Sequence, residues 1–144
     1  MSVVDFIYEA APSRVVFGTG TISTLSSELD RLKLERSLVV STPSQAARAR
    51  QMVESLRPRE SGLFTDATIH TPVEITERGL SAAEEAQADC LIAIGGGSAT
   101  GLSKAIAVQT GLPQIVLPTT YAGSEMTPLL GETRAGIKQT RKDP

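Results

Sequence analysis

Short apolar runs alternate along this chain with segments of helical periodicity. The runs at 37–42, 89–94 and 114–118 are almost uninterrupted, which is typical of parallel strands buried on both faces. Weaker strand signals lie at 14–18 (RVVFG) and at 63–70 (LFTDATIH). The pattern therefore predicts a chain in which strands alternate with helices.

Between these strands, apolar residues recur at spacings of three and four, which predicts amphipathic helices. One helix is expected on each side of the strand at 37–42, and a polar break at 57–62 follows the second of them. Another begins near Ser98 and ends at Gly111 and Pro113. The residues that define these three faces are Ile22, Leu25, Leu29 and Leu32; Ala49, Met52, Val53 and Leu56; and Leu102, Ala105, Ile106 and Gln109.

A further helix is predicted from the start signal at 71–74 to about Ala88. Thr71 can cap this helix, Pro72 suits its first position, and Glu74 can complete a capping box. The helix precedes the buried run that contains Cys90, the single cysteine. A lone cysteine excludes an internal disulfide, and its apolar neighbours favour a buried, inert thiol.

Strands that alternate with helices imply parallel pairing and a doubly wound, mostly parallel, Rossmann-like α/β sheet. The segment after 118 breaks this rhythm. We expect a hairpin over 129–140, with Gly136 in its turn. The 144 residues are enough for one core of ordinary size.

Composition narrows the classes of partner. Hydrophobic residues make up 40% and charged residues 21%, which is typical of a globular chain. A net charge of -2 argues against a general nucleic-acid footprint, and aromatics at 3% argue against binding by stacking. The chain shows neither a membrane-spanning run nor a signal peptide, so we expect a cytoplasmic protein without nucleic-acid or membrane partners.

A glycine turn, Gly95, Gly96 and Gly97 followed by Ser98, lies between a buried strand and a helix. In an open α/β sheet, ligands bind beyond the carboxyl ends of the strands. Glycines let a bulky anion approach the backbone, and the helix N-terminus supplies positive potential. Ser98 adds a hydroxyl donor or a cap. The turn favours a phosphate or pyrophosphate, although its spacing matches neither G-x-G-x-x-G nor the Walker pattern, and a tight turn without a ligand fits the same residues.

A second polar loop, LPTTYAGSEMTP at 117–128, follows the next strand. It carries hydroxyls at Thr119, Thr120, Tyr121, Ser124 and Thr127. Two glycine-bearing loops at adjacent strand ends could form the floor of a dinucleotide site. Loop hydroxyls also serve as turn and cap residues, so a structural role remains open.

Taken together, GGGSATGLSKAIA, LPTTYAGSEMTP and GETRAGIKQTRKDP resemble the maleylacetate reductases of the iron-containing alcohol dehydrogenase superfamily. The wider superfamily reads GGGS-x-x-D-x-x-K, whereas this chain has Gly101 at the aspartate position. Its PTTYAGSE is one residue shorter than the common PTTAGTGSE. Both departures resemble the maleylacetate reductase branch.

The resemblance implies an NADH- or NADPH-dependent reduction of maleylacetate to 3-oxoadipate, in the degradation of resorcinol, hydroxyquinol and chlorinated aromatics. It implies that 95–98 hold the pyrophosphate and that Thr119, Thr120 and Ser124 face the cofactor. Thr42 stands where NAD-preferring relatives often carry aspartate, so tolerance of both cofactors is expected.

The resemblance also implies that residues 1–144 form the N-terminal dinucleotide-binding domain of a two-domain, dehydroquinate synthase-like fold. The helical C-terminal domain would be absent, and with it the groups that clamp the dicarboxylate and supply the proton, so no catalytic residue is named. One histidine, His70, cannot build a multi-histidine site, and no metal is expected. Lys104 is expected to be structural, Glu125 to cap or orient its loop, and Lys138 and Arg141 to be solvated charges.

Two other functions fit parts of the sequence. A metal-dependent alcohol dehydrogenase of the same superfamily shares the glycine turn, although Gly101 and the short PTTYAGSE loop argue against it. A non-catalytic nucleotide-binding module would bind without turnover. The full enzyme is expected to be a homodimer, and self-association of this chain through 3–10 as an edge strand is plausible.

Overall fold

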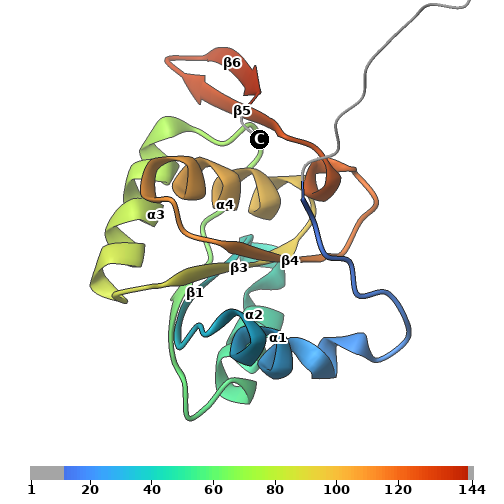
Figure 1. The fold of residues 1–144 in the computed structure, drawn as a ribbon. Helices are drawn as coiled ribbons and strands as arrows, with labels where there is room; N and C mark the ends of the chain where they lie inside the picture. Colours follow the sequence, from blue (N-terminus) through green and yellow to red (C-terminus); the bar gives the residue numbers. More distant parts are fainter. Residues whose placement is uncertain (1–11, 143–144) are drawn as a thin grey trace, which may run out of the picture.

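A computed structural model describes residues 12–142 of the chain. Four parallel strands form one sheet in the order β2-β1-β3-β4 (Figure 1). They are β1 (Arg36–Ser41), β2 (Glu60–Phe64), β3 (Cys90–Gly95) and β4 (Gln114–Pro118). Helices α1 (Leu25–Leu32) and α2 (Ala46–Ser55) cover one face of the sheet, and α3 (Val73–Glu85) and α4 (Gly97–Thr110) cover the other. The predicted doubly wound α/β sheet is confirmed.

Side chains of the two central strands alternate between two hydrophobic clusters. Val39 and Ile92 pack on the α1–α2 side, whereas Leu38, Val40 and Leu91 pack on the α3–α4 side. Strand β3 is buried along its whole length, and β1 is buried from its second residue onward. This burial on both faces explains why both strands read as continuous apolar runs.

The winding of the chain reverses between β1 and β3. From β1 the chain moves through α2 to the neighbouring β2; it then returns through α3 to β3, on the other side of β1, and continues through α4 to β4. The loops that leave β1 and β3 therefore run to opposite faces of the sheet. In open α/β sheets, such a switch point at the carboxyl ends of the strands, here β1 and β3, is where ligands bind.

A β-hairpin follows the sheet, as predicted. Strands β5 (Leu129–Arg134) and β6 (Ile137–Lys142) pair antiparallel, with Arg134 opposite Ile137 across the turn. Ala135 and Gly136 have φ values of 48° and 77°, the pattern of a two-residue turn with left-handed backbone at both positions. Leu130 of β5 is buried and anchors the hairpin beside α4.

The strand predicted at 14–18 is wrong. These residues form no strand, and Val15 and Phe17 are exposed to solvent, so this apolar run neither pairs with the sheet nor joins the core. The strand predicted at 63–70 is misplaced: β2 spans 60–64 and so begins inside the segment predicted to be a polar break. Edge pairing with β1, from Arg36–Glu60 to Val40–Phe64, outweighs the weak apolar signal of ESG.

The predicted start of α3 is also corrected. Helix α3 begins at Val73, with Pro72 as its N-cap and no side-chain capping bond, so neither Thr71 nor Glu74 caps it. Thr71 instead adopts φ 43° and is buried, and its carbonyl accepts from the Thr133 N–H of β5 at 3.1 Å. The helix ends at Glu85 rather than near Ala88, because the chain turns at Gln87, where φ is 49°. The edge strand proposed at 3–10 lies outside the described residues.

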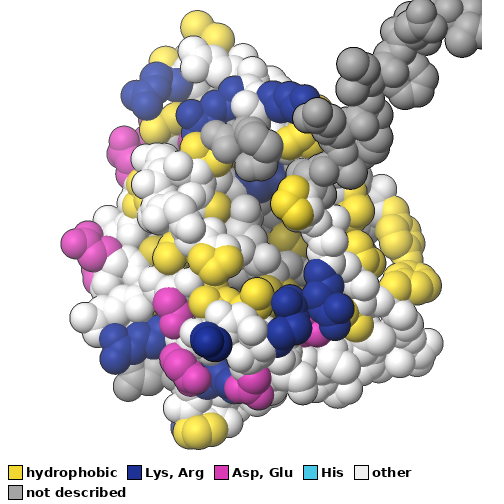
Figure 2. Space-filling view, viewed as in Figure 1, with side chains coloured by type: hydrophobic (Ala, Val, Ile, Leu, Met, Phe, Trp, Pro, Cys, Tyr) yellow, Lys and Arg dark blue, Asp and Glu magenta, His cyan; other side chains and the backbone are white. Residues whose placement is uncertain are grey.

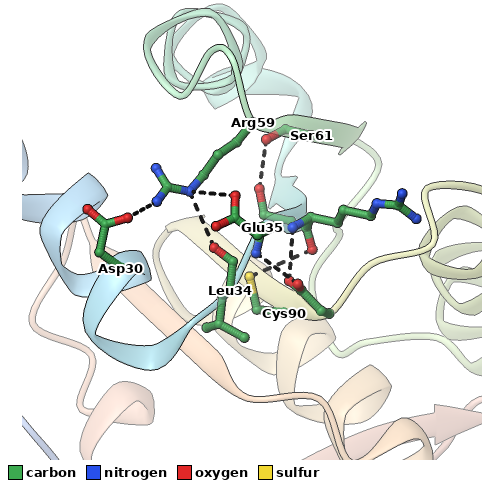
Figure 3. Close-up of polar contacts among 9 residues, drawn as sticks. Asp30, Leu34, Glu35, Arg59, Ser61 and Cys90 are labelled. Atoms are coloured by element: carbon green, nitrogen blue, oxygen red, sulfur yellow. Dashed lines mark hydrogen bonds and ion pairs between the residues drawn. The ribbon is translucent and has the colours of Figure 1, made fainter.

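The amino edge of the sheet is closed by a polar network (Figure 3). The Arg59 guanidinium contacts Asp30 of α1, pairs with Glu35 at 3.6 Å and donates to the Leu34 carbonyl at 3.3 Å. The hydroxyls of Ser37 and Ser61 lie 2.8 Å apart and connect β1 to β2. Because these groups satisfy one another, this edge reads as a structural closure.

Candidate functional site: the glycine turn at the sheet's switch point

The predicted site residues follow strands that end at the same edge of the sheet. Ser41 pairs with Ile94, and Gly95 pairs with Pro118, so Thr42, Gly96 and Thr119 leave the sheet side by side. The Thr119 N–H donates to the Gly95 carbonyl at 2.9 Å and extends the register by one step. The structure thus brings together the loops that carry Thr42, the glycine turn and the two threonines.

Each glycine of the turn has its own geometric role. Gly95 has φ 146°, in the region that favours glycine. A Cβ on Gly96 would lie 2.9 Å from Thr120 Oγ1, so the two loops touch at this point. A Cβ on Gly97 would meet no atom within 4 Å, so the backbone there faces open space. The turn is closed toward β4 and open at the start of α4.

The amides of the first turn of α4 have no side-chain cap. Gly96 is the N-cap of this 14-residue helix, and no side chain caps it. The Thr100 hydroxyl bonds back to the Gly96 carbonyl at 3.1 Å and not to the amides of the first turn. Ser98 lies within the first turn, so its predicted alternative as a cap is wrong. Uncapped amides beside an open glycine fit a phosphate or pyrophosphate.

Ser124 is held against α4 by Lys104. Ser124 begins a short 3-10 helix (η3, Ser124–Met126) after Gly123, whose φ is 86°. Lys104 Nζ donates to Ser124 Oγ at 3.3 Å and to the carbonyls of Thr127 and Leu129 at 2.7 and 3.0 Å. Burial lowers the pKa of Lys104, and the nearby Glu125 carboxylate partly offsets this effect. The expected structural role of Lys104 agrees with these contacts.

Thr42 lies at the same edge but is engaged locally. It precedes a 3-10 helix (η2, Pro43–Gln45), and its Oγ1 lies 3.0 Å from Ser44 Oγ. The side chain of Thr42 is uncharged and hydrogen-bonds within its own loop.

His70 is exposed and follows β2 in the loop that leads to α3, where its φ is 63°. Within residues 12–142, no group of three His, Cys, Asp or Glu side chains is arranged to hold a metal ion. None of the helices in this part of the chain is long and apolar enough to cross a membrane.

Lys and Arg side chains gather over the β5–β6 hairpin (Figure 2). Strand β6 is exposed along its length, so Lys138 and Arg141 are open to solvent, as expected. Arg141 lies 3.9 Å from Glu132 across the hairpin. These cations therefore lie on an exposed hairpin.

Two hollows lie away from the glycine turn, at the amino edge of the sheet. One is lined by Arg57 and Arg59 together with Val53, Pro58 and Ser61. Both arginines are already paired, Arg57 with Glu54 and Arg59 with Asp30 and Glu35. The other hollow, between the ends of α3 and α4, is lined by Leu80, Ser81, Ala83, Glu84, Ala88, Thr110 and Leu112. Neither joins a helix N-terminus to strand carboxyl ends, so the glycine turn remains the candidate site.

Thr71 borders the site and was not predicted to do so. A Cβ on Gly101, one helical turn after Gly97, would lie 2.9 Å from Thr71 Oγ1. Thr71 therefore fills the space that an aspartate at position 101 would need. The glycine at 101 is visible in the sequence, but the loop conformation that places Thr71 over it is not.

Comparison with known proteins adds the family context. The family model described as "Iron-containing alcohol dehydrogenase" matches residues 12–143. The maleylacetate reductase of Rhizobium sp. (strain MTP-10005) is 52% identical, over 96% of this chain and 40% of the relative. The maleylacetate reductase of Burkholderia cepacia is 49% identical, over 96% of this chain and 39% of the relative.

Solved structures agree with the sequence relatives. The crystal structure of the Rhizobium reductase superposes with a TM-score of 0.93 over 97% of this chain and 40% of that chain. The maleylacetate reductase from Agrobacterium tumefaciens, 48% identical, gives 0.93 over 99% and 41%. An NADH-dependent butanol dehydrogenase from Thermotoga maritima, 18% identical with a TM-score of 0.85, shares the fold. The chain spans about 40% of the length of the curated relatives it matches.

Proposed function

Because this chain belongs to the iron-containing alcohol dehydrogenase family, we propose that it forms the dinucleotide-binding part of a maleylacetate reductase. The observation that carries the proposal is the open, uncapped glycine turn at the switch point of a sheet that superposes on reductases of that name. The whole enzyme would reduce the carbon–carbon double bond of maleylacetate to give 3-oxoadipate, a step in the breakdown of aromatic compounds.

The cofactor would lie across the carboxyl ends of β1, β3 and β4. The glycines and Ser98 would hold the pyrophosphate, and the open position at Gly97 gives that group room to approach. Thr119 and Thr120 would lie near the nicotinamide half, and Ser124 would also face the cofactor. When bound, NADH or NADPH supplies the hydride for the reduction. Thr42 neither bonds a ribose as an aspartate would nor repels a 2′-phosphate, which supports use of both cofactors.

The remaining parts of the machinery would lie beyond this segment. Maleylacetate is a dicarboxylate and needs cationic or N–H partners. Lys104 donates to loop oxygens, and the hairpin cations are exposed, so neither group supplies a formed clamp. We therefore assign substrate clamping and protonation to the helical domain and expect residues 1–144 alone to be inactive. A homodimer of the whole enzyme is part of the same proposal.

Turnover by a chimera tests this function. The chain is joined to the segment that follows the matched region in the Rhizobium reductase, its 52% identical relative. We expect the chain alone to bind NADH without turnover and the chimera to oxidise NADH when maleylacetate is added. A chimera that binds NADH but does not turn over maleylacetate would contradict the proposed function and favour a non-catalytic nucleotide module.

A further inference from the structure

Lys104 is the polar centre of the contact between α4 and the segment 124–129. Its Nζ has four oxygen neighbours: the carbonyls of Thr127 and Leu129 at 2.7 and 3.0 Å, and the hydroxyls of Ser124 and Thr127 at 3.3 and 3.4 Å. Gly97, Gly101 and Lys104 are spaced by four and three residues, so they share one face of α4. Lys104 thus fixes the second polar loop on the helix face that begins at the glycine turn.

The number of N–H donors on Lys104 determines how its hydrogen bonds are divided among the four oxygens. An ammonium has three N–H groups and accepts no hydrogen bond. The two shortest contacts go to carbonyl oxygens, which can only accept. The third N–H is therefore shared between the hydroxyl oxygens of Ser124 and Thr127, which lie at nearly equal distances.

This arrangement sets the direction of the Ser124 hydrogen bond. A serine hydroxyl has one proton to donate and two lone pairs that accept. Because Lys104 occupies a lone pair of Ser124 Oγ, the Ser124 proton cannot be directed at Lys104 and stays available to another acceptor. No acceptor for that proton is found within residues 12–142. A cofactor oxygen at this edge of the sheet would supply one.

We propose that Lys104 is a positioning residue of the dinucleotide site: it holds 124–129 on α4 and orients Ser124 as a hydrogen-bond donor to the bound cofactor. The inference rests on the proposed function, because it assumes that a dinucleotide occupies the glycine turn. The Ser124 hydroxyl would donate to an acceptor oxygen of NADH or NADPH. This hydroxyl is a neutral donor, and the hydrogen bond that it accepts from the Lys104 ammonium polarises it.

The test is a double-mutant cycle on NADH binding, followed by the fluorescence of the cofactor. Lys104→Met removes the donors and keeps the apolar stem, and Ser124→Ala removes the proposed bond to the cofactor. We expect each to weaken binding by about tenfold, and the double variant to be no weaker than the worse single variant. Lys104→Arg restores N–H donors and is expected to bind within about threefold of the wild-type chain.

Two controls separate orientation from folding. Thr127→Val removes the competing hydroxyl but keeps the carbonyl, so Lys104 donates fully to Ser124 and NADH binding is expected to be unchanged. Hydrogen exchange of the amides at 124–129 reports the segment without cofactor. These amides are expected to exchange faster in Lys104→Met but not in Ser124→Ala.

The outcomes divide cleanly. Wild-type affinity in Lys104→Met would overturn the inference, and so would singles whose effects multiply to about a hundredfold in the double variant. Failure of Lys104→Arg to recover any binding, in a folded chain, would also count against it. A wild-type chain that binds no NADH would overturn the orienting role together with the proposed function, whereas additive effects on a binding chain would leave the proposed function intact.

Discussion

At the scale of single residues, the candidate site depends on two glycines, Gly96 and Gly97, which have no side chain. A Cβ on Gly97 would meet no atom within 4 Å, and Gly96 lets Thr120 approach to a distance that a Cβ would not permit. The atoms that would bind an anion are backbone amides, which no side-chain motif announces. The groups of this region that could bind a ligand are therefore the backbone amides at these two glycines and the hydroxyls around them.

Cys90 carries a reactive side chain, but its burial makes the thiol unreactive. It is fully buried at the start of β3, and burial, helped by the neighbouring Asp89 carboxylate, raises its pKa to about 12. We predict that the folded chain reacts with a thiol reagent at about pH 8 on the order of a thousandfold more slowly than the unfolded chain, because the thiolate is scarce and covered. Thiol labelling with and without denaturant measures this. Fast labelling of the folded chain would show that Cys90 is accessible.

At the scale of elements, loops and helices are fitted to one another in pairs. The loop before α3 places Thr71 over Gly101 of α4, and the Thr71 carbonyl accepts a hydrogen bond from β5. Thr71 is β-branched and has φ 43°, an uncommon conformation for such a residue, held by these neighbours. This packing explains why position 101 carries glycine.

The contact between Thr71 and Gly101 predicts that Gly101→Ala changes the free energy of unfolding in opposite directions with and without the Thr71 side chain. Gly101→Ala alone is expected to lower the free energy of unfolding by about 1 kcal/mol, because overpacking against Thr71 Oγ1 exceeds the gain in helix propensity. In a Thr71→Ala background, the same change is expected to raise it by up to about 1 kcal/mol. Chemical denaturation of the four chains tests this. An equal effect of Gly101→Ala in both backgrounds would contradict the contact.

The hairpin turn offers a stabilising change. Ala135 has φ 48° and precedes Gly136, the positions where two-residue turns favour Asn and Gly. We predict that Ala135→Asn raises the free energy of unfolding by about 0.5 kcal/mol, since asparagine tolerates this conformation better than alanine. Thermal unfolding of the two chains measures the difference. Exposed Lys138→Asn on β6 serves as a control that adds asparagine without a strained backbone.

Sequence reasoning succeeded where burial imposes a pattern. Side chains of β1 and β3, such as Leu38, Val39 and Ile92, are buried in two clusters on opposite faces of the sheet, so both strands could be predicted from their apolar runs. The glycines at 111 and 136 correctly predicted a helix end and a turn. Sequence reasoning misplaced the edge strand β2, which is set by pairing with β1 and not by apolar residues. The role of Lys104 could not be anticipated in detail, because two of its acceptors are backbone carbonyls that only the fold brings to it.

At the scale of the whole molecule, the described fold leaves apolar side chains without cover. Phe17 is 84% and Tyr121 is 92% exposed, and Val15, Met126, Leu129 and Ile137 are also exposed. The chain matches only about 40% of the length of its relatives. Exposed apolar side chains of this kind are typical of a surface that packs against further protein.

The measurement that tests the central claim most directly is NADH binding by Gly97→Val, with Gln109→Val as the matched control. Both changes add a valine to α4, one at the open glycine and one at the exposed far end of the same helix. A Cβ at 97 would meet no atom within 4 Å, so we expect a valine there to leave folding intact while blocking the approach of a pyrophosphate to the backbone. We predict saturable NADH binding by the wild-type and Gln109→Val chains and a loss of at least about a hundredfold in Gly97→Val. Equal NADH affinity in all three chains would contradict the account, since the cofactor would then not lie on the glycine turn.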